Sequence, residues 1–349
     1  MPPSSDEVVA MPFTPPAKPS LEDETDSAPD PSRRAFLTGL GALFATAGFG
    51  LIPPGATAQW LEPSPLPRPN WPPRSFDEPR PWIDNDLNDT IQRYLTTQRR
   101  IGRVAANERT AWLVYDFTSG RFLATINANI PYQSASMVKP FIALAFFYKV
   151  REGVFQYTPF HRQKMEAMIQ RSDNRATNYF IELLNRTSRR SGPAEAEHTL
   201  KRRNPGIFRH TRIVERIPRG GRTYRNRASA LDYHRFLQAL WYDQLPYSGE
   251  LKRLLYLPNR DRVYTGAREV PRGTWVFDKT GTTARLCRDM GILVARGRDG
   301  RRYPYTFIGI IEKARPTKNY LAWKNTRGNV IREVSNLVYG HLRQRYDLV

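Results

Sequence analysis

The stretch from Tyr132 to Phe147 constrains this chain most, because a turn of small residues leads there directly into a long apolar segment. A helix that begins near Ser136 would place Ser136 and Lys139 on one face, since residues three apart are neighbours on a helix. The apolar run from Phe141 to Phe147 would then keep water from the lysine amine and leave the amine partly neutral. A neutral amine can take the proton of a serine hydroxyl, so the stretch predicts a nucleophile beside its base.

Net charge narrows the choice of partners. The 349 residues include 54 Lys and Arg against 33 Asp and Glu, a formal net charge of +21. Such a balance indicates an anionic partner. The sequence has no zinc-finger spacing, helix-turn-helix pattern or ribonucleoprotein motif, so we expect an anionic cell-envelope surface and no nucleic acid. The single cysteine, Cys287, excludes an internal disulfide, and the five scattered histidines predict no metal site.

The N-terminal segment resembles a twin-arginine export signal. Arg33 and Arg34 precede a glycine-interrupted apolar segment that ends at Ile52, and an Ala-x-Ala site ends at Ala58. We therefore expect residues 1–58 to be a signal peptide that engages the Tat translocase. The protein would then be exported to the periplasm, the cell envelope or the extracellular space. An uncleaved membrane anchor is the alternative, because the apolar segment is near the lower length limit for a membrane span.

The rest of the chain divides into a linker and one domain. Residues 59–81 are dense in proline and predict an extended linker, and residues 82–349 form the domain. Residues 189–227 are expected to be irregular and strongly basic. Hydrophobic periodicity predicts these elements in order: a helix with Leu87, Ile91 and Leu95; a hairpin of Thr110–Phe117 and Arg121–Ile126; a helix from Ser136; helices at Arg162–Gln170 and Ala176–Asn185; a helix with Leu231 and Trp241; strands at Thr274–Asp278, Met290–Ala295 and Tyr305–Ile311; and a closing helix with Val330 and Val338.

This order of elements predicts an α+β fold. An antiparallel sheet would be assembled from both chain ends and flanked by helices, and the middle of the chain would insert an all-helical subdomain.

Two further motifs accompany the Ser136-x-x-Lys139 pair. Ser172-Asp173-Asn174 lies in the central helical region, and the strand after that region supplies Asp278-Lys279-Thr280-Gly281-Thr282. Three such motifs in this order resemble the signature of class A β-lactamases and penicillin-binding proteins. The resemblance covers the chain from about Thr110 to Ile311. It implies a β-lactamase/transpeptidase-like fold and a serine hydrolase that needs no cofactor or metal.

The resemblance implies a role for each residue of the first two motifs. Ser136 would attack an amide or β-lactam carbonyl, and Lys139 would accept its proton. Ser172 would pass a proton to the leaving nitrogen. Asn174 would hydrogen bond to the substrate amide and to Lys139, while Asp173 would cap and brace the local turn.

The third motif would bind the substrate. The second catalytic lysine, Lys279, would hold the substrate carboxylate, and the hydroxyls of Thr280 and Thr282 would share it. Gly281 would leave room for a substrate laid along the strand edge. By resemblance, the backbone N–H groups of Ser136 and Thr282 would stabilise the oxyanion.

Two assignments stay open at this stage. Class A members activate the deacylating water with a glutamate in a Glu-x-x-Leu-Asn pattern, which this chain lacks. Glu215 is the only carboxylate between Lys201 and Ala230 and is therefore the candidate base. The alternative is that Glu215 pairs with a nearby cation, which would lower its pKa and weaken it as a base. Either Arg285 or Arg288 would add to carboxylate binding.

Three functions follow. The first is a class A-like β-lactamase that opens β-lactams through an acyl-enzyme on Ser136; it is favoured because the interval from Ser172 to Lys279 resembles that of the family. The second is a penicillin-binding D,D-carboxypeptidase or transpeptidase that acts on peptidoglycan stem peptides. The third is a non-catalytic envelope-binding protein on the same fold, against which the intact motifs argue.

Overall fold

The computed structural model describes residues 85–218 and 225–349. The predicted signal peptide, residues 1–58, and the predicted linker, residues 59–81, lie outside these ranges. None of the helices within the two ranges combines the length and the apolar character that a membrane crossing requires.

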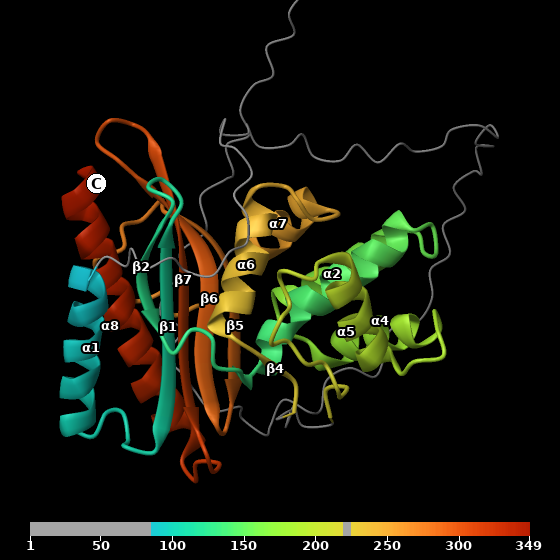
Figure 1. Cartoon of the computed structure of the whole chain (residues 1–349), viewed down its shortest axis with the longest axis horizontal. Coiled ribbons are helices and arrows are strands. Elements are labelled where there is room, and N and C mark those ends of the chain that lie inside the picture. The colour runs from blue at the N-terminus through green and yellow to red at the C-terminus, as the bar shows by residue number, and fades with distance from the viewer. Residues whose placement is uncertain (1–84, 219–224) are drawn as a thin grey trace, which may run out of the picture. The chain divides into compact units, whose positions relative to one another are not determined.

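One five-stranded antiparallel sheet forms the centre of the domain, with the strand order β2-β1-β7-β6-β5 (Figure 1). The N-terminal hairpin and the three C-terminal strands meet where β1 pairs with β7, so the sheet is assembled from both chain ends, which confirms the predicted fold class. A second, two-stranded pairing joins β3 and β4. The strands are β1 (Glu108–Asp116), β2 (Arg121–Ile126), β3 (Tyr132–Gln133), β4 (Arg227–Ala228), β5 (Trp275–Thr283), β6 (Leu286–Arg296) and β7 (Arg302–Lys313).

Helices cover both faces of the sheet. The first and last helices, α1 and α8, lie on one face, and α6 lies on the other (Figure 1). Helix α7 and η2 contact β5, and the helices α2 to α5 lie farther from the sheet. The helices are α1 (Asn85–Arg100), the 3₁₀ helix η2 (Ala135–Val138), α2 (Lys139–Arg151), α3 (Pro159–Ile169), α4 (Asn174–Asn185), α5 (Gly192–Arg203), α6 (Ala230–Trp241), α7 (Ser248–Tyr256) and α8 (Tyr320–Tyr346).

The two faces of the sheet bury separate apolar cores. On β6, Met290 and Ile292 face the core that contains α2 and α6, while Leu293 and Ala295 face the core beneath α1 and α8. Alternate side chains of a strand point to opposite faces, so a strand between two helical layers must be apolar at both. This requirement explains the continuous apolar run that predicted the strand.

Four local predictions were wrong or incomplete. Residues 189–227 are not irregular throughout, because α5 begins at Gly192 with a proline in its first turn and ends in three basic residues that suit its C-terminal dipole. Helix α7 was not predicted. Ser136 lies in η2 rather than in the α-helix, which begins at Lys139. Strand β5 runs on to Thr283, beyond the predicted end at Asp278, so the whole third motif lies within the strand that was expected to supply it.

Glu108 joins the first strand of the sheet to the last helix. Its buried carboxylate accepts a hydrogen bond from Trp323 Nε1 at 2.6 Å and pairs with Arg327 at 2.9 Å between Oε1 and Nη2. It also accepts from the backbone N–H of Ala105 at 3.0 Å. One carboxylate therefore ties β1 to α8, two elements from opposite ends of the described chain.

We expect Glu108→Gln to lower the free energy of unfolding by about 3 kcal/mol, because the change leaves the nearly buried Arg327 guanidinium without its counter-ion. Urea denaturation of the full chain measures the loss. Glu269→Gln, which removes the exposed ion pair with Arg343, is the matched control and should change stability by less than about 0.5 kcal/mol. Equal losses for the two variants would contradict a structural role for the Glu108 contacts.

Candidate active site

Ser136 stands out in an otherwise buried segment. From Tyr132 to Tyr148 every residue is buried except Ser136, which is partly exposed. The preceding residue, Ala135, has a φ of 41°, in the left-handed region that residues with a Cβ rarely adopt. The chain therefore presents one hydroxyl outward at the entrance to α2, from a backbone held in a strained turn.

Lys139 is completely buried, and its amine is held between two elements. Its Nζ donates to Ser172 Oγ at 3.1 Å, to the Ser172 carbonyl and to Asn174 Oδ1 at 2.9 Å. These contacts join the first two motifs as the sequence predicted. The Lys139 amine forms no hydrogen bond with the Ser136 hydroxyl, although the sequence predicts that the two residues lie on one face of a helix.

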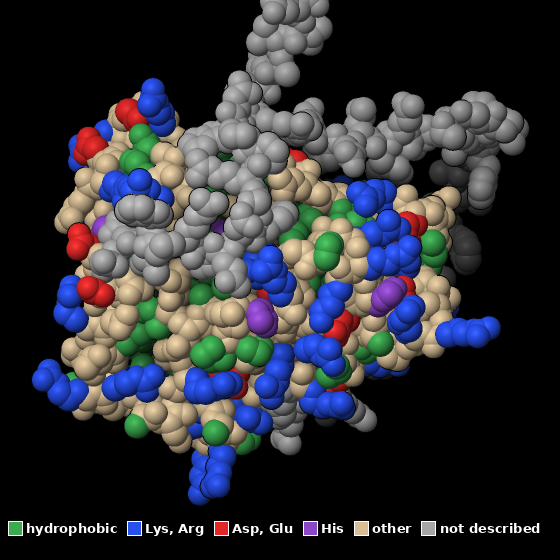
Figure 2. All heavy atoms as spheres, viewed as in Figure 1, with side chains coloured by type: hydrophobic (Ala, Val, Ile, Leu, Met, Phe, Trp, Pro, Cys, Tyr) green, Lys and Arg blue, Asp and Glu red, His purple; other side chains and the backbone are tan. Residues whose placement is uncertain are grey.

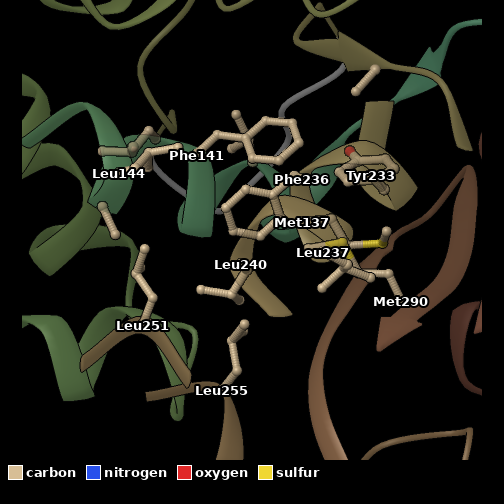
Figure 3. Close-up of a cluster of buried hydrophobic side chains, with 14 of the residues drawn as sticks. Met137, Phe141, Leu144, Tyr233, Phe236, Leu237, Leu240, Leu251, Leu255 and Met290 are labelled. Atoms are coloured by element: carbon tan, nitrogen blue, oxygen red, sulfur yellow. The ribbon is translucent and has the colours of Figure 1, made fainter. Parts of the chain in front are cut away.

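Burial lowers the pKa of Lys139 to about 6, and the nearby positive charge of Lys279 adds to the effect, while Asp173 acts in the opposite direction. Lys139 is the first residue of α2, and its chain neighbours Met137, Val138 and Phe141 are all buried. Figure 3 shows Met137 and Phe141 packed in a cluster with side chains of α6. At neutral pH the amine is mostly uncharged and can accept a proton.

The second motif forms the start of α4. Asp173 is the N-cap of this helix and accepts a hydrogen bond from the backbone N–H of Ala176 at 2.6 Å, which confirms its predicted bracing role. Ser172 has a φ of 58°, so it is a second residue of the site in the left-handed region. The cap and the strained turn fix the direction in which Ser172 faces Lys139.

The third motif lies on β5, the edge strand of the sheet, against which η2 packs. Lys279 is buried and donates from Nζ to the Thr280 carbonyl at 3.0 Å. Burial lowers its pKa to about 8, although the Asp278 and Asp289 carboxylates oppose this shift. A Cβ at Gly281 would lie 3.3 Å from Met137 Cγ, so the glycine permits the close approach of η2 to the strand.

Arg262 is a site residue that the sequence analysis missed. This buried arginine donates from Nη2 to Thr282 Oγ1 at 2.8 Å and from Nη1 to the Arg288 carbonyl at 3.2 Å. Its backbone N–H donates to Asp289 at 2.6 Å. Because Thr282 Oγ1 accepts from Arg262, the hydroxyl proton of Thr282 is free to point elsewhere. No motif marks position 262, so nothing in the sequence points to Arg262 as a site residue.

Of the two candidate arginines, Arg288 points inward. Its side chain is fully buried, crosses Gly281 and places Cζ 4.8 Å from the centre of the Tyr233 ring. Arg285 is partly exposed and donates from Nε to the Lys313 carbonyl at 3.4 Å. The role of Arg288 in binding a substrate carboxylate stays a prediction.

Glu215 lies near the site but its described contacts are with its own loop. The carboxylate accepts from the backbone N–H of Arg225 at 2.8 Å, and the backbone N–H of Glu215 donates to Asn226 Oδ1 at 3.1 Å. The Asn226 carbonyl in turn accepts from the backbone N–H of Ser134 at 2.8 Å, two residues before Ser136. The loop is thus anchored beside the nucleophile, while neither Ser136 nor Lys139 contacts the Glu215 carboxylate.

Asn178 is a second residue that the sequence analysis missed, and it holds the same loop to α4. Its side chain donates to the Ile217 carbonyl at 2.8 Å and accepts from the Ile217 N–H at 2.9 Å. Asn178 follows Asn174 by four residues, so both lie on one face of the helix. This four-residue spacing is the sequence feature that could have identified Asn178. The loop residue fixed on this face is therefore the buried, apolar Ile217 and not Glu215.

Metal ligands do not cluster here. Across residues 85–218 and 225–349 there is no group of three or more His, Cys, Asp or Glu side chains that could hold a metal ion.

Comparisons with known proteins agree with this geometry. The profile of Beta-lactamase2, a β-lactamase enzyme family, matches residues 161–342, more than half of the chain. No curated protein matches the sequence significantly.

Several solved structures share the fold. A mutant of PBP-A in an acyl-enzyme complex with penicillin G is 21% identical, with a TM-score of 0.59, and the match covers 76% of this chain and 100% of that chain. A β-lactamase from Chitinophaga pinensis is 15% identical, with a TM-score of 0.58 and coverage of 74% and 100%. The class A β-lactamase of the last common ancestor of Gram-negative bacteria is 20% identical, with a TM-score of 0.56 and coverage of 73% and 99%. At these identities the likeness shows the fold alone.

We expect Lys139→Met to remove a pH dependence of stability. Between a folded pKa of about 6 and the ordinary value of 10.5, the unfolded chain binds a proton that the folded chain does not. The stability of the unmodified protein relative to the variant should therefore rise with pH by about 1.4 kcal/mol per pH unit in this window. Denaturant unfolding of both proteins at several pH values measures the difference.

Lys252→Met is the matched control, because it removes an equally buried lysine that pairs with Asp243 at 2.8 Å. The free energy of unfolding of this variant should still rise with pH as it does in the unmodified protein, because Lys139 is present in both. A stability difference between Lys139→Met and the unmodified protein that does not change with pH would mean that Lys139 stays charged in the folded state.

Proposed function

The chain belongs to the β-lactamase enzyme family, and on that premise we propose that it is a serine acyl-transferase of the penicillin-binding peptidase type. It would form an acyl-enzyme on Ser136 with β-lactams and with peptidoglycan stem peptides. The observation that carries the peptidase assignment is that the Glu215 carboxylate is engaged by the Arg225 N–H, while Ile217 occupies the loop position fixed to α4.

Acylation follows from the neutral state of Lys139. Ser136 Oγ attacks the carbonyl carbon of the substrate while its proton passes to Lys139 Nζ, which the lowered pKa leaves free to accept it. The tetrahedral intermediate then expels the amide nitrogen. Ser172 donates its hydroxyl proton to that nitrogen and regains one from Lys139 across the 3.1 Å hydrogen bond between Nζ and Oγ. The lysine ends neutral and Ser136 carries the acyl group as an ester.

Substrate binding would use the exposed side of β5. This strand is the last in the sheet, so its outer edge can pair with an extended substrate backbone. Lys279, still mostly protonated at neutral pH, would attract the substrate carboxylate. The hydroxyls of Thr280 and Thr282 would share that carboxylate, and the bond from Arg262 would orient the Thr282 hydroxyl.

Deacylation separates the peptidase from the β-lactamase. A β-lactamase needs a base that activates water beside the ester, and a carboxylate serves only if it lies within about 3 Å of that water. Neither serine nor lysine of the first motif contacts Glu215, and Asp173 is committed to capping α4. These contacts favour a long-lived acyl-enzyme. The PBP-A mutant structure with penicillin G is itself an acyl-enzyme complex.

The place of action follows from the N-terminal sequence. The arginine pair at Arg33-Arg34 and the Ala-x-Ala site before Gln59 support export through the Tat translocase. We therefore propose that the protein is exported to the periplasm, the cell envelope or the extracellular space, and that it acts where peptidoglycan is present.

We expect the full chain, when it is mixed with penicillin, to gain the mass of one penicillin and to keep this mass after one turnover. Intact-mass spectrometry over time, with ring opening followed in parallel, measures both quantities. Ser136→Ala should gain no mass, because the nucleophile is absent. Glu215→Gln should form an adduct with the same lifetime as the unmodified protein.

Two results would overturn the assignment. Sustained ring opening with a short-lived adduct, which Glu215→Gln traps, would establish a β-lactamase with Glu215 as its base. Mass gain by Ser136→Ala would remove Ser136 as the nucleophile.

The acylation rate should have a bell-shaped pH dependence. It should rise as pH increases through about 6, because Lys139 must lose its proton, and fall above about 8, because Lys279 must keep its own. Stopped-flow acylation by a chromogenic β-lactam gives the second-order rate constant at each pH. Lys279→Arg keeps the positive charge at all these pH values and should remove only the descending limb. A flat profile below pH 8 would exclude a neutral Lys139 as the base.

A further inference from the structure

Two arginines lie directly opposite each other in a strand pair beside the site. The backbone N–H of Arg212 donates to the Arg227 carbonyl at 2.8 Å, and the N–H of Arg227 donates to the Arg212 carbonyl at 2.9 Å. Residues that exchange both bonds face each other with side chains on the same side. Both side chains are exposed. Like charges in this arrangement repel and cost stability unless an anion lies across them.

This pair continues the strand that leads into the nucleophile. Arg227 on β4 pairs with Gln133 on β3, and the next residue, Ser134, donates its N–H to the Asn226 carbonyl at 2.8 Å. Strand β3 ends two residues before η2 begins. Adjacent strands lie about 4.8 Å apart, so the paired arginines are within two strand spacings of the chain that carries Ser136.

Positive charge extends beyond the pair. Arg225 is also exposed, two residues before Arg227. We call Arg212, Arg225 and Arg227 the arginine ridge. Lys and Arg side chains gather on the face in view, including the zone where β4 lies (Figure 2). The same stretch of chain has these exposed arginines: Arg202, Arg203, Arg209, Arg212, Arg216, Arg225 and Arg227.

Acidic side chains neutralise the ridge only in part. Arg212 lies 3.4 Å from Glu197, between Nη1 and Oε1. Arg227 forms no ion pair with any residue of the described ranges. By contrast, Arg253 of α7 pairs with Glu250 at 2.7 Å between Nε and Oε2. Arg327 of α8 pairs with Glu108 at 2.9 Å between Nη2 and Oε1. The Glu215 carboxylate also lies at the ridge, where it accepts from the backbone N–H of Arg225 at 2.8 Å. Three arginines therefore have two carboxylates beside them, and the ridge keeps a surplus of positive charge at the surface.

We propose that the arginine ridge binds peptidoglycan through the carboxylates of neighbouring stem peptides and so holds the polymer beside Ser136. This inference rests on the proposed function, because it names the polymer that carries the peptide substrate. Guanidinium groups bind carboxylates in a bidentate fork, which favours arginine here over a diffuse lysine patch. Each exposed contact is weak, so the ridge requires a partner that repeats its negative charge, as a polymer does.

Cosedimentation of the full chain with insoluble peptidoglycan tests whether the arginine ridge binds the polymer. We expect Arg212→Gln/Arg227→Gln to weaken binding about tenfold, and binding of the unmodified protein to fall as salt is raised, because exposed charges are screened. The control is Arg298→Gln/Arg301→Gln, which removes the same number of exposed charges at the turn between β6 and β7, where these arginines pair with Asp347 and Asp299. It should change binding less than about twofold.

Acylation by soluble penicillin distinguishes failure of this inference from failure of the proposed function. Both double variants should acylate at the rate of the unmodified protein, because the ridge side chains lie outside the motifs. Equal weakening by the ridge and control variants would show that net charge alone drives binding and would overturn the ridge. Tighter ridge-dependent binding to DNA or to anionic lipid vesicles than to peptidoglycan would overturn the choice of polymer. If the protein binds peptidoglycan through the ridge but forms no adduct with penicillin, the inference about the ridge stands and the proposed acyl-enzyme chemistry is wrong.

Discussion

The burial of one amine organises the site. Lys139 is held uncharged between Ser172 and Asn174, and this contact joins α2 to α4 and the first motif to the second. Keeping a lysine neutral at pH 7 when its ordinary pKa is 10.5 costs roughly 5 kcal/mol of stability. Lys139 begins α2, and the buried apolar side chains of this helix supply compensating burial. The same packing therefore stabilises the domain and makes the lysine a base.

The sheet supplies the other half of the site because of how its strands are ordered. Strand β5 is at the edge, so its backbone is available to a substrate, and η2 packs against it. This approach requires Gly281, because a Cβ there would lie 3.1 Å from Arg288 Cγ as well as close to Met137. The pairing of β1 with β7 holds the hairpin and the C-terminal strands in one sheet. Contacts between distant parts of the chain thus place three short motifs together.

The sequence was sufficient where chemistry and periodicity agree. The motifs at Ser136, Ser172 and Lys279 could be found because their residue types and order carry the information, and the sheet followed from apolar strands. Helix α5 was missed because Gly192 and the proline after it resemble a break. In the fold, a Cβ at Gly192 would lie 2.0 Å from the Ile181 carbonyl, so the glycine serves close helix packing. Arg262 could not be predicted, since only the folded chain brings it to the third motif.

Strained backbone and buried contacts are found at the residues proposed for acylation more than at the loop that contains Glu215, the candidate base for deacylation. Ala135, which precedes the proposed nucleophile, and Ser172, the proposed proton donor, both have positive φ, and each such residue costs on the order of 1–2 kcal/mol. The surrounding core and the α4 cap stabilise both conformations, so the turn before Ser136 and the contact between Lys139 and Ser172 form without substrate. The loop with Glu215 has no comparable construction: α4 fixes the backbone of Ile217 instead. This difference is the physical basis on which we propose that the acyl-enzyme accumulates.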